Sequence, residues 1–150
     1  MIDAVYNSKL LELASNIGAT TRLHTPDASA SAHSKLCGST VTIDLRVDDK
    51  GVVTDYGQHV RACALGQATA SIMAEQIIGT HGDELRDTRS AAYAMLKENA
   101  PAPDGRFADL KYLEPVREYK ARHASTLLVF DAVIDALDEI EAKRGLAVPA

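Results

Sequence analysis

Residues 40–63 read TVTIDLRVDDKGVVTDYGQHVRAC, and they carry the clearest structural signal in the chain. Apolar residues occupy every second position from Val41 to Val47, which is the pattern of a strand with one buried face. Residues 48–51 have the composition of a turn, and a second strand is predicted over residues 52–62. The stretch therefore predicts an antiparallel β-hairpin.

Helical patterns flank this hairpin on both sides. The expected helices cover residues 3–14, about 64–79, about 83–96 (with Thr80 or Asp83 as its cap), a short piece around 107–113, and 123–143. Residues 20–25 are assigned to a short edge strand, and the small-residue run at 26–34 is assigned to a mobile loop. The order predicts an α+β fold, in which a small antiparallel sheet of about three strands packs against helices. The N-terminal helix comes first and a long C-terminal helix comes last.

Length and composition narrow the class of protein. A chain of 150 residues is long enough for one domain with its own core, so a single domain over residues 1–150 is expected. A net charge of -5 and only 5% aromatic residues argue against nucleic-acid binding. The N-terminus does not resemble a signal peptide, and no apolar run approaches the ~20 residues of a membrane span. We therefore expect a soluble, cytoplasmic protein without membrane contact.

One loose group of basic residues stands out against the acidic balance of the chain. It consists of Lys111, Arg117, Lys120 and Arg122. Such a group either lies on a solvated helix face or meets an acidic partner.

The two cysteines, Cys37 and Cys63, come together once the hairpin is drawn. If Val47 faces Val52 across the turn, one bulge in the second strand, for which Gly57 is a candidate, places Cys37 opposite Cys63. Opposed β-carbons lie about 5 Å apart, so one metal ion could join both sulfurs. Cys63 also precedes a helix, whose free N–H groups favour a thiolate. The alternative is that both cysteines are small buried packing residues without chemistry.

Several short motifs occur in the order found in a known protein family. They are Cys37-Gly38 before the hairpin, Cys63 before the small-residue helix start at 64–68, Tyr6 with residues 16–18, and LEPVREYKAR at 113–122. Over about residues 3–137, the chain resembles the U-type iron–sulfur cluster assembly scaffolds, the family of IscU, SufU and the NifU N-terminal domain. The resemblance implies a scaffold or carrier that is not an enzyme. Such a scaffold receives sulfur from a cysteine desulfurase, binds iron, a nascent [2Fe–2S] cluster or zinc, and passes the cluster to cluster-accepting apo-proteins.

The family binds its cargo with three cysteines and an aspartate, of which Cys37 and Cys63 carry over. Ser39 stands where the family has its aspartate, and either Ser125 or its neighbour at 124 stands where the family has its third cysteine. His123 is a chemically sound substitute because imidazole ligates some iron–sulfur centres, whereas a serine oxygen is a hard ligand at a soft site. His123 and Ser125 are both candidate ligands. The alternative for His123, at a helix start, is a surface or capping histidine.

Two other functions are consistent with this sequence. A diverged scaffold fold could act as a sulfur acceptor or zinc-bound adaptor that builds no cluster. A metal-free interaction domain would instead use both cysteines for packing. The number of soft ligands separates these functions, and the sequence leaves the metal, the oligomeric state and the recipient proteins open.

Overall fold

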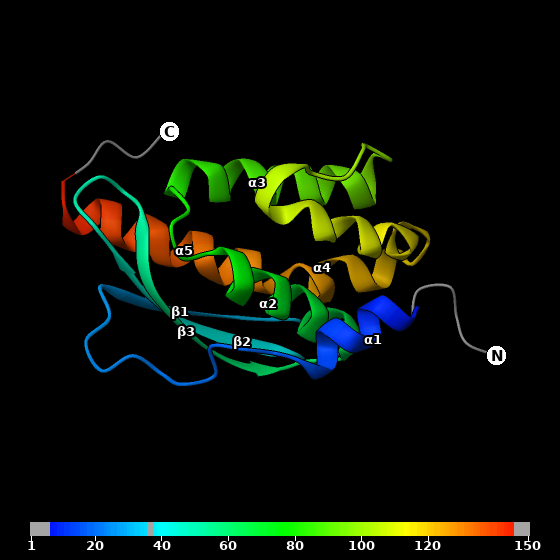
Figure 1. Ribbon diagram of the computed structural model, residues 1–150, viewed down its shortest axis with the longest axis horizontal. Coiled ribbons are helices and arrows are strands. Elements are labelled where there is room, and N and C mark those ends of the chain that lie inside the picture. Colours follow the sequence, from blue (N-terminus) through cyan, green and yellow to red (C-terminus); the bar gives the residue numbers. More distant parts are fainter. Residues whose placement is uncertain (1–6, 36–37, 146–150) are drawn as a thin grey trace.

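The computed structural model describes residues 7–35 and 38–145. Within them the elements are α1 (Ser8–Ser15), β1 (Ala28–His33), β2 (Thr40–Val47), β3 (Val53–Arg61), α2 (Ala64–Gln76), α3 (Gly82–Lys97), the 3₁₀ segments η1 (Gly105–Glu118) and η2 (Lys120–Arg122), α4 (His123–Thr126) and α5 (Leu128–Lys143). Figure 1 shows the helices gathered on one face of the sheet. The predicted α+β fold is confirmed, with a helix first and a long helix last.

The described strands form one antiparallel sheet in the order β1-β2-β3. The predicted hairpin is β2 and β3, but its register differs from the prediction. Val47 faces Val53 rather than Val52, and the bulge follows directly, so that the extra residue is Thr54. Val52 instead bridges to His81 ahead of α3, a tertiary contact that no local pattern reports. The bulge predicted at Gly57 is wrong, because this residue is regularly paired in the sheet.

The third strand, β1, lies in the small-residue run where the sequence predicts a mobile loop. Its alanines at 28, 30 and 32 face inward, and they alternate with Ser29, Ser31 and His33 on the outer face. This period of two is a strand signal, but alanine and serine differ too little in hydrophobicity to make it conspicuous. Small side chains suit β1, because α5 packs across β1 and β2.

The edge strand predicted at residues 20–25 is wrong, because this segment is an irregular loop that crosses the outer face of the sheet. A β-carbon at Gly57 would collide with the Thr21 carbonyl oxygen, so this glycine permits the close approach. The fully buried Asp44 carboxylate accepts hydrogen bonds from the Arg22 guanidinium at 2.6 and 2.9 Å and from the Leu23 N–H at 2.9 Å. The outer face therefore fixes the loop that leads into β1.

The inner face of the sheet is covered by two layers of helix. In Figure 1, α5 and α2 lie next to the sheet, and α3 lies beyond them. A buried polar residue, Gln58, ties this layer to the sheet, because its amide donates to the carbonyls of Gly18 at 2.9 Å and Ala70 at 3.1 Å. The Tyr56 hydroxyl donates to the remaining oxygen of Gln58 at 2.6 Å, and burial raises the pKa of that tyrosine well above its ordinary value. These bonds hold the middle of α2 and the segment that follows α1 against β3.

Two helix boundaries differ from the sequence prediction. The cap of α3 is His81, whose Nδ1 accepts a hydrogen bond from the Asp83 N–H at 3.0 Å, and neither Thr80 nor Asp83 has that role. The helix predicted over residues 123–143 is divided into α4 and α5, because Leu127 leaves the helical conformation. Among the described residues, no helix is both long and apolar enough to span a membrane.

Candidate functional site

The turn between β1 and β2 forms one half of the candidate site. The Ser34 N–H donates to the Ser39 carbonyl oxygen at 2.9 Å, and the Gly38 N–H donates back to the Ser34 carbonyl oxygen at 2.9 Å. Gly38 has a φ of 70°, a conformation that glycine adopts without strain. Ser39, at the position of the family aspartate, is buried. Cys37 itself, with its predicted position opposite Cys63, lies outside the described residues.

The junction of β3 and α2 forms the other half. Arg61, the last residue of β3, pairs with Thr40, the first residue of β2, and Thr40 also pairs with His33 at the end of β1. Cys63 follows two residues after Arg61, so it lies at the same end of the sheet as the turn that contains Gly38. The fold thus brings the sequence neighbours of one cysteine to the sheet end that carries the other.

Cys63 is the N-cap residue of α2 and is half-buried. Its backbone is extended, with φ -68° and ψ 172°, and its carbonyl oxygen accepts the Gln67 N–H at 3.0 Å. The Cys63 side chain makes no capping hydrogen bond. The first N–H groups of a helix lack partners within the helix and favour a negative ligand, so this sulfur occupies a position suited to metal-thiolate chemistry.

Ser125 lies on α4, which packs against the first turn of α2. A β-carbon added at Gly66 would lie 3.1 Å from the Ser125 carbonyl oxygen and 2.8 Å from the Ala62 β-carbon, so only glycine fits between them without displacement. The Ser125 side chain is buried, and its hydroxyl donates to the Arg122 carbonyl oxygen at 3.2 Å. Ser125 is therefore near the correct helix, but ligation by its oxygen would require this hydrogen bond to break.

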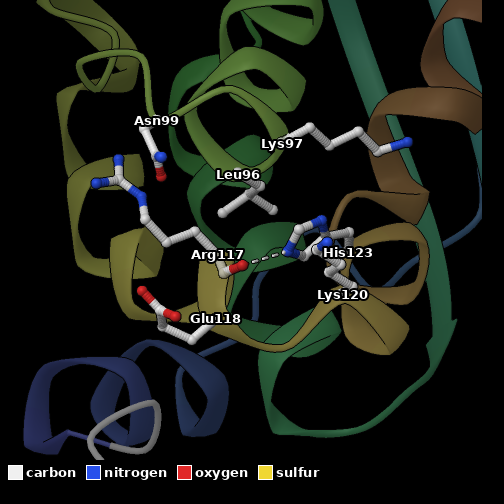
Figure 2. A pocket seen from close by; sticks show the side chains of 7 residues that line it. All are labelled: Leu96, Lys97, Asn99, Arg117, Glu118, Lys120 and His123. Carbon is white, nitrogen blue, oxygen red and sulfur yellow. Dashed lines mark hydrogen bonds between the residues drawn. The ribbon is translucent and has the colours of Figure 1, made fainter.

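His123 is also buried, and its Nε2 lies 3.0 Å from the Val116 carbonyl oxygen and 3.2 Å from the Arg117 carbonyl oxygen. Carbonyl oxygens only accept hydrogen bonds, so Nε2 carries the hydrogen and Nδ1 is the nitrogen that could bind a metal. Figure 2 shows the ring in a cavity together with Lys97 and Lys120. These positive neighbours oppose a metal cation at His123.

Residues 7–35 and 38–145 contain no group of three His, Cys, Asp or Glu side chains placed to hold a metal ion together. The predicted ligand set therefore stays a prediction; it consists of Cys37, Cys63, His123 and Ser125. Cys37 is not among the residues that the structure describes. Within them, Cys63 has the most suitable surroundings for a soft metal ligand.

Comparison with known proteins gives the family. The model of the NifU-like N terminal domain matches residues 5–125 of this chain. The chain belongs to that family. The iron–sulfur cluster assembly scaffold protein IscU of Thermotoga maritima is 31% identical over 105 residues, which cover 69% of this chain and 72% of that protein. The resemblance inferred from the motifs is thus confirmed, and the family is one of iron–sulfur cluster assembly scaffolds.

Solved structures place this NifU-like chain in the same fold. The N-terminal part of a nitrogen-fixing NifU-like protein from Brucella abortus is 61% identical, with a TM-score of 0.92, and the match covers 94% of this chain and 97% of that one. A protein from Fervidobacterium islandicum AW-1, described as a candidate iron–sulfur cluster assembly scaffold for the SUF system, is 20% identical with a TM-score of 0.80. That match covers 89% of this chain and 96% of that one. At this lower identity, the likeness shows the fold alone.

Sequence reasoning missed two features of the site in this NifU-like domain. Gly66 sets the distance between α2 and α4, and its signal was available, because a glycine inside a helical pattern marks close packing. Lys97 and Asn99 join Lys120 and His123 around one cavity, and no sequence pattern could have indicated this grouping across two segments of the chain.

Proposed function

We propose that this protein is a scaffold or carrier that binds iron or a nascent [2Fe–2S] cluster through Cys37 and Cys63 and receives sulfur from a cysteine desulfurase. Scaffolds of this family interact with sulfur donors and cluster acceptors and are generally not enzymes. The observation that carries the proposal is the pairing of Thr40 with Arg61, which brings the Gly38 turn and Cys63 to one end of the sheet. The half-buried position of Cys63 supports it, because a cargo site must be reachable by donors and acceptors.

The cargo is expected to bind less tightly than in a scaffold with four ligands of its own. Ser39 and Ser125 replace two family ligands, and the Ser125 hydroxyl is bound to a backbone carbonyl. Closed metal sites use four ligands, so the remaining positions would be completed by His123 or by donors from outside the chain. A weakly held cluster is easier to pass to an acceptor, which is consistent with a carrier.

Sulfur transfer would proceed by thiol exchange at Cys63. The Cys63 thiolate attacks the terminal sulfur of a desulfurase persulfide, the donor S–S bond breaks, and the donor cysteine leaves as a thiolate. Cys63 then carries the persulfide, and an external reductant supplies the electrons that convert its outer sulfur to sulfide. With limiting iodoacetamide, we expect metal-free protein to be labelled at Cys63 before Cys37, as read by mass spectrometry. Preferential labelling of Cys37 would reverse this assignment.

Anaerobic reconstitution tests the cluster function directly. Metal-free protein is incubated with ferrous iron, cysteine, a cysteine desulfurase and dithiothreitol, and cluster formation is followed by visible absorption. Wild-type protein should develop cluster absorption, and Cys63→Ala should abolish it. Full absorption in Cys63→Ala would refute the proposed ligand.

The role of His123 needs a matched histidine control. His59 is exposed on the outer face of the sheet, so His59→Ala removes an imidazole without touching the candidate site. If His123 completes the ligand set, His123→Ala should lose iron to a chelator faster than wild type, while His59→Ala should not. Equal retention in both variants would remove His123 from the ligand set.

A second function, sulfur acceptor without cluster assembly, is supported by the half-buried Cys63 at the start of α2, because accepting a persulfide sulfur needs one reachable thiol and no further ligand. Under this alternative, desulfurase treatment would leave a persulfide on Cys63 detectable by mass spectrometry, while the reconstitution mixture would develop no cluster absorption. The two readouts together separate the two functions.

A further inference from the structure

A cavity of about 550 Å³ lies where the end of α3 meets the ends of η1 and η2. It is lined by Leu96, Lys97, Asn99, Arg117, Glu118, Lys120 and His123 (Figure 2). The cavity is open to solvent, and Leu96 is the purely hydrocarbon side chain in its lining. Small-molecule pockets are mostly apolar and enclosed, so this cavity is better suited to a polar group presented by a larger partner.

The charge of this cavity is opposite to that of the chain. Three cations, at Lys97, Arg117 and Lys120, line it against one acid, Glu118, whereas the whole chain carries -5. Lys97 and Lys120 are exposed, and neither has an ion-pair partner among the residues that the structure describes. Arg117 pairs with Glu114 at 3.9 Å, so Lys97 and Lys120 are the lining cations that remain without a counter-ion. Local positive charge attracts an anionic group and speeds its arrival.

The cavity wall is held in place before any ligand arrives. The Arg117 guanidinium donates to the carbonyl oxygens of Met95 and Ala100, both at 3.2 Å, and so links the end of α3 to η1. The Nε2 of His123 is bound to carbonyl oxygens at the end of η1, so the buried imidazole forms a fixed part of the lining. A site formed in advance costs less ordering on binding.

The sequence indicates a basic group at Lys111, Arg117, Lys120 and Arg122, and the fold divides it. Lys111 and Arg122 lie over the rings of Tyr112 and Tyr119, at 5.3 and 5.6 Å from the ring centres. Arg117 and Lys120 instead line the cavity, where Lys97 joins them from the end of α3. The Lys97 ammonium also lies 5.1 Å from the ring centre of Tyr93, a contact that leaves its charge without a counter-ion.

We infer that this cavity is a docking site for an acidic segment of a partner protein, whose aspartate or glutamate side chain faces Lys97 and Lys120. The cavity lining includes no aromatic side chain, so bases of a nucleic acid would find no stacking surface there. Glu118, an exposed acid in the lining, repels a long uniform polyanion but permits a short acidic segment. The inference concerns a surface other than Cys63 and does not depend on cluster binding.

Fluorescence anisotropy with metal-free protein tests this docking site. The probe is a fluorescein-labelled peptide of alternating aspartate and glycine, and its control has asparagine in place of aspartate. Binding of the aspartate peptide should weaken as salt rises from about 0.05 to 0.5 M, because salt screens exposed charges. Lys97→Glu and Lys120→Glu should each weaken it by about fivefold, since each replaces attraction by repulsion at an exposed site.

Lys50→Glu is the matched control variant, because Lys50 is exposed in the β2–β3 turn and its reversal changes the net charge equally. It should weaken binding by less than about twofold, and all three variants should unfold within a few degrees of wild type. Equal weakening by Lys50→Glu, equal binding of the asparagine peptide, or no saturation at millimolar peptide would overturn the inference. Binding of citrate or of a single-stranded oligonucleotide more tightly than the aspartate peptide would also overturn the inference, because it would identify a small-anion or a nucleic-acid site instead.

Discussion

Asp44→Asn is the substitution that most directly tests how the outer face of the sheet is held together. Asp44 is fully buried in the middle of β2, and both of its oxygens are used. One oxygen accepts Arg22 Nε at 2.6 Å and the Leu23 N–H at 2.9 Å. The other accepts Arg22 Nη2 at 2.9 Å and the Ser29 hydroxyl at 2.5 Å. These bonds fix the loop that leads into β1. Their loss should therefore make this loop more mobile, and with it β1, which leads to the turn at Gly38.

The size of the stability loss follows from the hydrogen-bond donors that surround Asp44. An asparagine has one acceptor oxygen and one NH₂ group, so its NH₂ must face a guanidinium N–H of Arg22 in either orientation. In one orientation it also faces the Leu23 N–H, and in the other the Ser29 hydroxyl can turn to accept from it. At least one bond to a charged acceptor is lost, the others go to a neutral acceptor, and Arg22 loses its counter-ion, although water screens this half-exposed guanidinium. We expect Asp44→Asn to lower the free energy of unfolding by about 2–4 kcal/mol.

The effect should depend on pH in a defined direction. Burial raises the pKa of Asp44, but the hydrogen bonds from Arg22, Ser29 and the Leu23 N–H outweigh it and hold the pKa below its ordinary value. A lowered pKa in the folded state stabilises the protein above the unfolded-state pKa of about 3.9, and this stability is lost as pH falls through the folded-state pKa. The difference between wild type and Asp44→Asn should therefore be largest near pH 7 and shrink below about pH 4.

Urea unfolding followed by circular dichroism measures both quantities, with Asp55→Asn as the control. Asp55 lies on β3 and pairs with Arg46 at 3.7 Å, but its side chain is 53% exposed. Its substitution should cost less than about 1 kcal/mol, as for other exposed ion pairs. If Asp44→Asn and Asp55→Asn were equally stable at pH 7, the argument from the buried carboxylate would be refuted.

The remaining predictions concern glycines at close contacts. Gly57→Ala should destabilise the protein by about 1–3 kcal/mol in urea unfolding, because its β-carbon would meet the rigid Thr21 carbonyl; a variant as stable as wild type would show that the loop moves freely. Gly66→Ala would place a β-carbon 2.8 Å from the Ala62 β-carbon, so we expect net destabilisation of about 1 kcal/mol despite the better helix propensity of alanine. Gly82→Ala is its control, because the nearest atom would lie at an ordinary 3.4 Å, and its thermal midpoint should stay within a few degrees of wild type.

Local patterns were sufficient for the elements that bury one continuous apolar face. The alternation from Val41 to Val47 predicted β2 because every second side chain is buried against the helices. The helices α2, α3 and α5 followed from a period near 3.6, and Cys63 was placed correctly at the start of α2. The family also followed from the sequence, since its motifs depend on order and spacing along the chain.

Tertiary contacts decided the features that local patterns could not report. The alternating alanines of β1 became a strand because α5 and β2 supply the apolar surface that they lack. The register of β3 was set by Val52 bridging to His81, and Gly57 served a close loop contact rather than a bulge. His123, a candidate ligand by residue type, shares its cavity with Lys97, which comes from a distant segment at the end of α3. A sequence pattern reports the conformational preference of each residue among its near neighbours. Contacts between residues far apart in the chain form only when the whole core packs together.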